Sequence, residues 1–218
     1  MAHLVITRIE TSDWREIIEA HFQAFVHEPF QHLLHGEDTP RNRQIFEEQS
    51  LKKYTALSNS IWLKAVDTNN NGKIVGVVSY KLNPTYVPLQ RAKLDPDDMI
   101  WLEDPEDKRI LGTMFDDIVD RKLRLLKEGH IELDNLFVLP EYRGQGIASR
   151  LINWGCELAN HLMVPVWLEA SMMARPVYLK HGFVDIEHSR YVKGRWDVEY
   201  YVMRLEPRTG GVRVHTCN

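Results

Sequence analysis

One domain that mixes helices with strands is the fold class predicted by this 218-residue sequence. Some segments alternate apolar and polar residues, as half-buried strands do, and others carry apolar residues along one helical stripe. No internal repeat and no low-complexity linker separates these segments. Hydrophobic residues make up 44% of the chain, which is ordinary for a globular protein that buries a core. We therefore expect a single α/β domain.

The first third of the chain predicts a strand and two helices. Residues 4–9 alternate as a half-buried strand does. Residues 11–13, Thr-Ser-Asp, offer N-caps for a helix that begins near Trp14 and that Pro29 limits. A second helix is expected over residues 40–57, because a proline stands at its first position.

The middle third predicts a hairpin, an irregular stretch and a long helix. The two strands of the hairpin cover residues 61–66 and 74–82, with a polar turn between them. Four prolines and several carboxylates interrupt residues 83–107. Helical periodicity returns over about residues 108–127.

The last part of the chain has the clearest pattern. Its expected elements are a strand at 131–138, a turn at 140–146, a helix at 147–162, a strand at 164–170, a helix at 174–180, and strands at 183–191 and 198–205. Residues 207–218 show no periodicity, and we expect a mobile tail there.

Composition argues against several classes of protein. The net charge of −4 does not favour nucleic acid as the main partner, because nucleic-acid-binding proteins usually carry a basic excess. Cys156 and Cys217 make neither a disulfide framework nor a metal spacing, and the histidines form no helical metal pattern. No apolar run is long enough to span a membrane, and the start lacks the apolar stretch of a signal peptide. We expect a cytoplasmic protein without a bound metal.

The turn between the strand at 131–138 and the following helix has the features of an anion site. A helix N-terminus offers unpaired backbone N–H groups and a partial positive charge. Gly144 and Gly146 let the backbone approach an anion closely, and Arg143 adds a cation. A dinucleotide fingerprint would need a third glycine where Ser149 stands, and a P-loop would need Gly-Lys-Ser/Thr. By itself, such a turn most often has glycines for geometry alone.

Two ordered motifs add to this turn. The first is Glu141-Tyr142-Arg143-Gly144-Gln145-Gly146, and the second comprises Val166-Trp167-Leu168-Glu169-Ala170-Ser171 followed by Tyr178-Leu179-Lys180-His181-Gly182-Phe183. Together they resemble the GNAT family of N-acetyltransferases, whose acetyl-CoA signature is Q/R-x-x-G-x-G/A after a strand. Glu141 departs from the first position of that signature. A weaker resemblance extends from Leu4 to Leu205, with an insertion at about 84–127, and implies a GNAT-like domain over residues 1–206.

The resemblance implies a fold and a donor site. It implies a mixed, mostly antiparallel sheet of about seven strands with helices on both faces, and acetyl-CoA as the acyl donor. Backbone groups of Leu136, Phe137 and Val138 would pair with the pantetheine arm, where the fourth and fifth strands splay apart. The N–H groups of residues 143–148 would hold the pyrophosphate; these residues are Arg143, Gly144, Gln145, Gly146, Ile147 and Ala148.

Candidates for proton transfer follow from the same resemblance. Tyr178 matches a tyrosine often assigned as the general acid, and a phenol holds its proton at neutral pH. A carboxylate on the fourth strand often serves as the base, and Glu132 and Asp134 both fit. Strand alternation puts these two on one face with Leu136 and Val138. Each could instead be a solvated or ion-paired carboxylate, and a chain of waters could remove the proton.

The acceptor side is less marked. Phe25, His27 and Phe30 occupy the part of the family fold that usually lines the acceptor pocket, and Glu28 lies among them. Trp62 and Trp101 could add aromatic walls. Ser171 could bind the cofactor or cap the following segment. These residues complete the candidate site.

Direct acetyl transfer to a primary amine is the function that the sequence indicates. A small-molecule amine is the expected acceptor, because no second domain or basic groove is evident. A homodimer is compatible with the sequence. The alternatives are a non-catalytic acyl-CoA-binding or protein-interaction module on the same fold, and a nucleotide-dependent oxidoreductase, which the missing third glycine disfavours.

Overall fold

A seven-stranded sheet forms the centre of the computed structural model, which describes residues 3–56 and 58–208. Its strands run in the order β1-β2-β3-β4-β5-β7-β6. All neighbours pair antiparallel except β4 and β5, which are parallel. The strands are β1 (Leu4–Arg8), β2 (Ser60–Asp67), β3 (Lys73–Asn83), β4 (His130–Val138), β5 (Val166–Ser171), β6 (Val184–Lys193) and β7 (Trp196–Leu205). The mixed, mostly antiparallel sheet expected from the sequence is confirmed.

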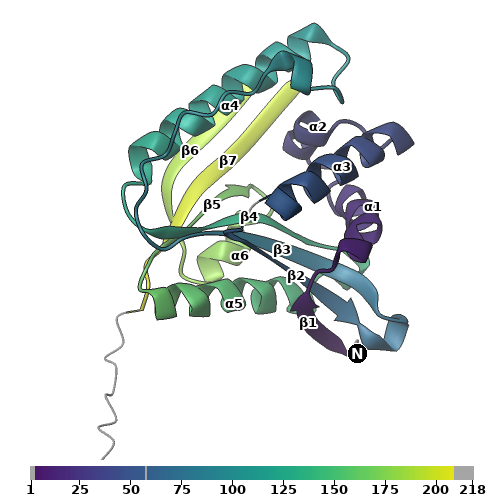
Figure 1. Ribbon diagram of the computed structural model, residues 1–218, viewed down its shortest axis with the longest axis vertical. Helices are drawn as coiled ribbons and strands as arrows, with labels where there is room; N and C mark the ends of the chain where they lie inside the picture. The colour runs from purple at the N-terminus through teal and green to yellow at the C-terminus, as the bar shows by residue number, and fades with distance from the viewer. Residues whose placement is uncertain (1–2, 57, 209–218) are drawn as a thin grey trace, which may run out of the picture.

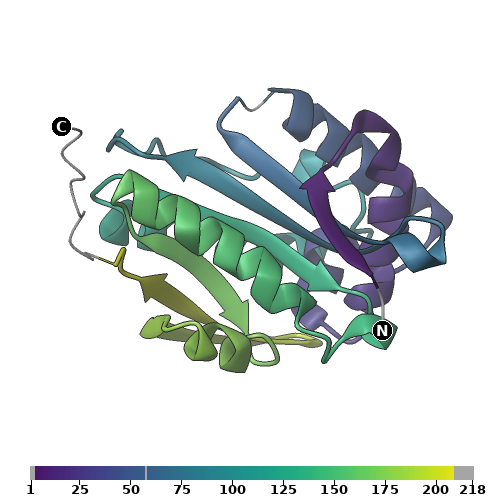
Figure 2. The same ribbon diagram turned by 90° about the horizontal axis from the view of Figure 1, so that it is seen from below.

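Helices cover both faces of this sheet, as expected (Figure 1). On one face α5 and α6 pack against β2–β5 through one core cluster, and Figure 2 views the molecule from the side of α5. On the other face α1 and α3 cover β2–β4, whereas α2 and α4 cover β5 and β7. The helices are α1 (Trp14–Ala24), α2 (Pro29–His35), α3 (Pro40–Ala56), α4 (Pro105–Leu125), α5 (Ile147–Leu162) and α6 (Arg175–Lys180).

The role expected for Pro29 is wrong. Helix α1 already ends at Ala24, and Pro29 begins a separate short helix, α2, that the sequence analysis missed. Proline fits the first turn of a helix, because the N–H that it lacks would have no intrahelical partner there. Leu57 and most of the expected tail at 207–218 lie outside the described residues.

Helix α4 begins earlier than its expected start at residue 108. The Asp104 side chain caps it by accepting a hydrogen bond from the Glu106 N–H at 2.8 Å. Asp107, from the acidic stretch, is buried and accepts hydrogen bonds from Trp196 Nε1 at 2.6 Å and from Arg195 at 2.7 Å. This carboxylate therefore ties the start of α4 to β7 and its preceding turn.

Strand β4 contains a bulge that changes which residues share a face. Ser79 lies opposite Asn135 and Tyr80 lies opposite Leu133, so Asp134 is the extra residue. A bulge shifts the alternation by one residue. Leu136 and Val138 consequently pack with the core under α5. On the opposite face, Lys81 pairs with Asp134 and also acts electrostatically on Glu132. The expectation that all four residues share one face is wrong.

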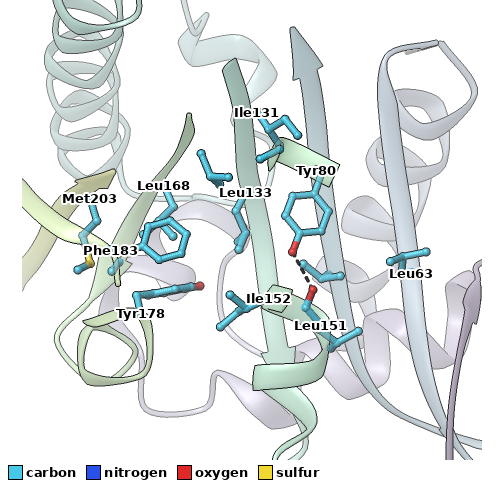
Figure 3. Close-up of a cluster of buried hydrophobic side chains, with 14 of the residues drawn as sticks. Leu63, Tyr80, Ile131, Leu133, Leu151, Ile152, Leu168, Tyr178, Phe183 and Met203 are labelled. Atoms are coloured by element: carbon cyan, nitrogen blue, oxygen red, sulfur yellow. Dashed lines mark hydrogen bonds between the residues drawn. The ribbon is translucent and has the colours of Figure 1, made fainter. Parts of the chain in front are cut away.

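The core under α5 contains one very close helix–strand contact. Tyr80 of β3 is buried, and its hydroxyl donates a hydrogen bond to the Leu151 carbonyl at 2.9 Å (Figure 3). A Cβ atom added at Gly155 would lie 2.3 Å from the Tyr80 ring. Glycine is therefore required where α5 crosses this ring.

A Gly155→Ala substitution should lower the free energy of unfolding by about 1–3 kcal/mol, because overpacking outweighs the gain in helix propensity. Gly112→Ala in α4 is the matched control, since its Cβ would meet only Met99 Cε at 3.8 Å. That control should gain about 0.5–1 kcal/mol. Urea denaturation measures both, and equal effects at the two sites would contradict the contact.

Candidate functional site

The turn between β4 and α5 adopts the conformation that its glycines allow. Gly144 and Gly146 both have φ of +77°, a left-handed conformation that side chains with a Cβ rarely adopt. No atom lies within 4 Å of the position of a Cβ at either glycine. The first hydrogen bond of α5 runs from the Arg150 N–H to the Gly146 carbonyl at 3.1 Å. The N–H groups of the first turn of α5 therefore have no intrahelical acceptor, whereas the Arg143 N–H, which was also expected to bind an anion, donates to the Pro140 carbonyl at 3.2 Å.

Neighbouring side chains hold this turn in place. The Tyr142 hydroxyl donates to Asp67 at 3.2 Å and accepts from Asn70 at 3.0 Å, which ties the turn to the β2–β3 hairpin. Glu141, the residue that departs from the family signature, pairs with Lys73 at 2.9 Å. This ion pair gives Glu141 a structural role at the position where it differs from the signature.

Arg143 stabilises the turn through hydrogen bonds from its side chain to the backbone. Its guanidinium donates to the Ala24 carbonyl at 2.7 Å and to the Val138 carbonyl at 3.2 Å. The side chain thus joins the end of α1 to the end of β4. Its charge still lies at the turn, but its position is fixed by the protein backbone.

Strands β4 and β5 separate soon after they meet. Their parallel register comprises only Ile131 with Val166 and Glu132 with Trp167. Beyond Glu132, no strand of the described chain pairs with β4 on this side. The backbone of residues 133–138 therefore has a free edge next to the β4–α5 turn, which agrees with the expected splay.

A cleft of about 540 Å³ opens on the sheet face that α1 to α4 cover. Its floor includes Leu133, Asp134, Asn135 and Leu136 of β4, and its sides come from α2, α3, α4 and β5. This volume is in the usual range for small-molecule sites. The cleft thus lies directly beside the free edge of β4.

Tyr178 of α6 reaches the cleft from the other face of the sheet. It is 4% exposed, and its ring contacts that of Phe183 edge-on at 5.5 Å between centroids. Figure 3 shows its hydroxyl directed toward β4 and α5. Burial raises the pKa of Tyr178, so the phenol keeps its proton at neutral pH. The residue both packs in the core and borders the cleft.

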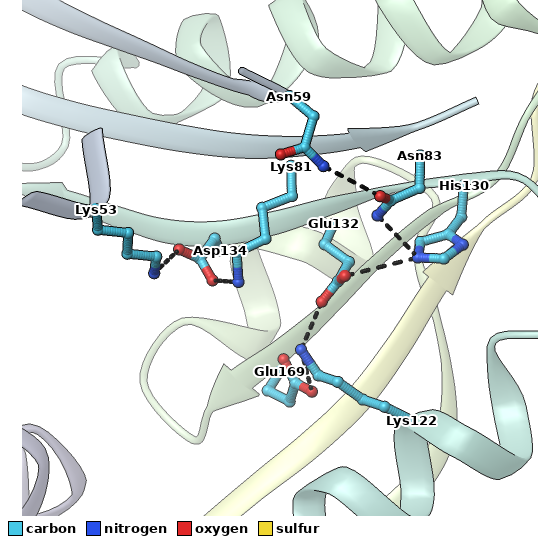
Figure 4. A network of polar contacts seen from close by, with 9 residues as sticks. All are labelled: Lys53, Asn59, Lys81, Asn83, Lys122, His130, Glu132, Asp134 and Glu169. Carbon is cyan, nitrogen blue, oxygen red and sulfur yellow. Dashed lines mark hydrogen bonds and ion pairs between the residues drawn. The ribbon is translucent and has the colours of Figure 1, made fainter. Parts of the chain in front are cut away.

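Glu132 and Asp134 each lie within a network of cations (Figure 4). Glu132 pairs with Lys122 of α4 at 2.5 Å, and the same ammonium lies 3.6 Å from Glu169 of β5. Asp134 pairs with Lys53 of α3 at 3.1 Å and with Lys81 of β3. The ion-paired alternative considered for both carboxylates is the one that the structure contains.

This network makes both carboxylates weak bases. Burial would raise the pKa of Glu132, but the His130 hydrogen bond and the charges of Lys122 and Lys81 hold it well below its usual range. Burial would also raise the pKa of Asp134, but the charges of Lys81 and Lys53 lower it to about 2. A general base works best with a pKa near the operating pH.

Glu28 has a different environment. It precedes α2, lines the cleft and is half-buried. Burial raises its pKa, although Arg143 and the Ser171 hydroxyl favour the charged form. No ion pair within 4 Å joins Glu28 to a cation in the part of the chain that the structure describes. Glu28 lies in the expected acceptor region, but its sequence context predicted no role for it.

The other expected acceptor residues divide into two groups. Phe25 and Phe30 line the cleft, as do Trp62 and Trp101. His27 is exposed and is not among the lining residues. Ser171 lines the cleft beside Glu28, and its hydroxyl also accepts a hydrogen bond from the Ala174 N–H at 3.3 Å, which is the expected cap.

The sequence matches a family model over residues 14–183, and that model describes the acetyltransferase (GNAT) family. The chain belongs to this family. An Escherichia coli protein described as an uncharacterized N-acetyltransferase, YafP, is 34% identical over 77 residues, which are 35% of this chain and 48% of YafP. The chain thus matches about half the length of that GNAT relative.

Solved GNAT structures share the fold. A histone acetyltransferase HPA2 and related acetyltransferase of Corynebacterium glutamicum has a TM-score of 0.62 and 21% identity, over 97% of this chain and 100% of that one. Arylalkylamine N-acetyltransferase 2 of Aedes aegypti has a TM-score of 0.63 and 18% identity, over 94% and 100%. These two structures show the shared fold, and the family model shows the GNAT family.

Within residues 3–56 and 58–208, no helix is long and apolar enough to cross a membrane. The same residues contain no group of three or more His, Cys, Asp or Glu side chains that could hold a metal ion.

The residues of this GNAT domain fit acetyl-CoA. GNAT enzymes generally use it as co-substrate. The open amides at Gly144–Ala148 suit a pyrophosphate, because nothing fills the space where a Cβ would lie at either glycine. The free β4 edge at residues 133–138 offers backbone groups to an extended amide-containing arm.

A Gly146→Asp substitution should weaken coenzyme A binding by about tenfold or more, because it places an anion where phosphate would bind. Gly72→Asp is the control: its φ is +73° and nothing lies within 4 Å of its Cβ position, so its backbone strain is similar. Titration calorimetry with coenzyme A compares the two. Wild-type affinity in the Gly146 variant would contradict the phosphate site.

Proposed function

We propose that this GNAT protein transfers the acetyl group of acetyl-CoA directly to the primary amine of a small molecule. The observation that carries the proposal is one continuous arrangement: an open glycine turn at a helix N-terminus, a free strand edge beside it, and a cleft that borders both. When bound, acetyl-CoA supplies the thioester carbonyl that the amine attacks.

The incoming amine must lose a proton before it attacks the thioester, and Glu28 is the group that we assign to accept it. An alkyl ammonium has a pKa near 10, so it arrives charged. Glu28 lines the cleft, has no ion-pair partner among the described residues and has a raised pKa. Glu132 and Asp134, the carboxylates favoured by the resemblance, are neutralised by lysines and are weaker bases.

Tyr178 is the proposed proton donor. Transfer forms a bond between the amine nitrogen and the acetyl carbon, and it breaks the bond from that carbon to sulfur. The leaving sulfur then needs a proton, which the buried Tyr178 hydroxyl holds at neutral pH. An alkyl ammonium loses two protons as it becomes an amide. Glu28 accepts the first before attack, and the second, lost from nitrogen as the amide forms, replaces the proton that Tyr178 gives to sulfur. The products are the amide, the free thiol and one proton, which Glu28 returns to solvent.

A compact amine fits the acceptor side of the proposal. The cleft volume of about 540 Å³ suits a small molecule, and Phe30, Trp101 and Tyr200 offer apolar contact. The fold neighbour from Aedes aegypti is named for arylalkylamines, which combine one amine with an aromatic body. We therefore place amines of this kind first in an acceptor screen.

A Tyr178→Phe variant should lower kcat by about a hundredfold while leaving coenzyme A affinity within about threefold, because only the proton donor is removed. Release of free thiol from acetyl-CoA, measured with phenethylamine as acceptor, reports kcat. Tyr80→Phe removes another buried phenol of the same core and should change stability rather than kcat.

Three results would go against these assignments. An unchanged kcat in Tyr178→Phe, with chemistry limiting, would remove Tyr178 as the acid. Coenzyme A binding without turnover of any amine would favour the non-catalytic module. No binding of any coenzyme A ester would refute the proposed function as a whole.

A Glu28→Gln variant should lower kcat by about a hundredfold or more. In the wild type, kcat at saturating amine should fall as the pH drops through the raised pKa of Glu28, since a protonated carboxyl cannot accept a proton. The variant should lose this acid limb. Glu37→Gln, an exposed carboxylate beyond α2, is the control. Retention of the limb in Glu28→Gln would assign the base elsewhere.

A further inference from the structure

Most charged side chains that line the cleft are ion-paired, but one carboxylate is not. Three lysines line it, namely Lys53, Lys81 and Lys122, and three carboxylates line it, namely Glu28, Asp134 and Glu169. Asp134 contacts two of the lysines, and Glu169 lies 3.6 Å from the third. Among the residues that the structure describes, Glu28 is the lining carboxylate without an ion pair. The cleft thus offers a ligand one carboxylate that no ion pair within 4 Å occupies, although Ser171 hydrogen-bonds it and the charge of Arg143 acts on it.

The clamp on Asp134 is built from three elements. Asp134 is the extra residue of the β4 bulge, and its side chain is 20% exposed. Lys81 of β3 contacts its Oδ1 and Lys53 of α3 contacts its Oδ2, so both carboxylate oxygens are occupied (Figure 4). Two positive charges surround one negative charge, which leaves this part of the cleft with a local excess of one positive charge.

Apart from Asp134 and its two lysines, the charged side chains near the clamp do not offer a binding site for a second cation. At the base of the splay the Lys122 ammonium pairs with both Glu132 and Glu169. Glu132 does not line the cleft, so the cleft wall there carries Lys122 and Glu169 as one balanced pair. His35, which also lines the cleft, is neutral at physiological pH, because burial and Lys53 lower its pKa to about 3. A second ammonium group near Asp134 would therefore meet Lys53 and Lys81 rather than a free carboxylate.

The geometry points to a selection rule for the acceptor, which rests on the proposed function. We propose that the Lys53–Asp134–Lys81 clamp restricts the site to amines that carry one cationic group on an apolar body, and that it excludes diamines and polyamines. The single ammonium lies at Glu28, and the apolar body contacts aromatic side chains of the same cleft. The aromatic lining residues are Phe25, Phe30, Phe46, Trp62, Trp101, Phe115, Tyr178 and Tyr200.

Lys53 is the residue on which this rule is best tested. Its side chain is 46% exposed, so a substitution there leaves no buried charge behind apart from Asp134, which keeps Lys81. Removal of the Lys53 charge halves the positive charge around Asp134. Reversal of that charge adds an anion that can bind a second ammonium. The effect should therefore follow the charge at residue 53 rather than its size.

Hexylamine and hexamethylenediamine are the matched probes, because they share a six-carbon chain and differ by one ammonium group. The readout is the ratio of kcat/KM for the monoamine to kcat/KM for the diamine, measured by thiol release from acetyl-CoA. The wild type should favour hexylamine by about tenfold or more. The ratio should persist in Lys53→Arg, fall by about tenfold in Lys53→Met and fall further in Lys53→Glu.

Lys52→Met is the control variant. Lys52 is the exposed neighbour of Lys53 on α3 and does not line the cleft, so its ratio should equal that of the wild type. Lys81→Met tests the other half of the clamp and should also lower the ratio. A wild-type ratio near one, or a ratio that does not follow the charge at residue 53 while hexylamine turns over, would overturn the selection rule alone. Absence of turnover with every amine would overturn the proposed function and the rule with it.

Discussion

The separation of β4 from β5 is the constraint on which the rest of the site depends. Two parallel strands that stayed paired along their length would leave neither a free edge nor room for a cleft. Here the pairing stops after Glu132 and Trp167, and the edge that it frees runs straight to the glycine turn. The same helix that begins at this turn, α5, packs beneath both strands and holds them in one sheet.

The separation also has an electrostatic consequence. Glu132 and Glu169 stand on the two diverging strands, and the Lys122 ammonium lies between them. The bulge beside this point turns Asp134 toward Lys53 and Lys81. Carboxylates paired in this way contribute to structure, and their low pKa values make them poor proton acceptors. Proton transfer is therefore assigned to groups outside the network, Glu28 and Tyr178.

Much of this fold could be predicted from residue patterns, because local signals and tertiary packing agree. The strand–turn–helix around Gly144 and Gly146 is one such case: its left-handed glycines and the stripe of α5 are both readable locally. Pro29 was misread because proline both stops a helix and suits the first turn of the next. These two roles of Pro29 can be told apart only from the residue at which α1 ends. Tertiary packing sets that end, so the local sequence does not reveal it.

The candidate site was predictable only in part. Gly144 and Gly146 have the left-handed conformation expected of the turn, and Tyr178 borders the cleft, while the roles of Arg143 to Ala148 and Tyr178 toward acetyl-CoA stay predictions. The bulge at Asp134 has no signal in the strand sequence, since it depends on the register with β3. The roles of Lys53, Lys81 and Lys122 were also hidden, because these lysines come from three distant segments that meet only in the folded chain.

Hydrogen–deuterium exchange with and without coenzyme A tests the central claim most directly, because it reports on the backbone amides that the claim concerns. Binding should slow exchange in two segments together, the free β4 edge at residues 133–138 and the turn at residues 143–148. The hairpin between β6 and β7 should exchange at the same rate in both states. Protection of other segments, with these two unchanged, would contradict the claim that the splayed strands and the glycine turn form the donor site.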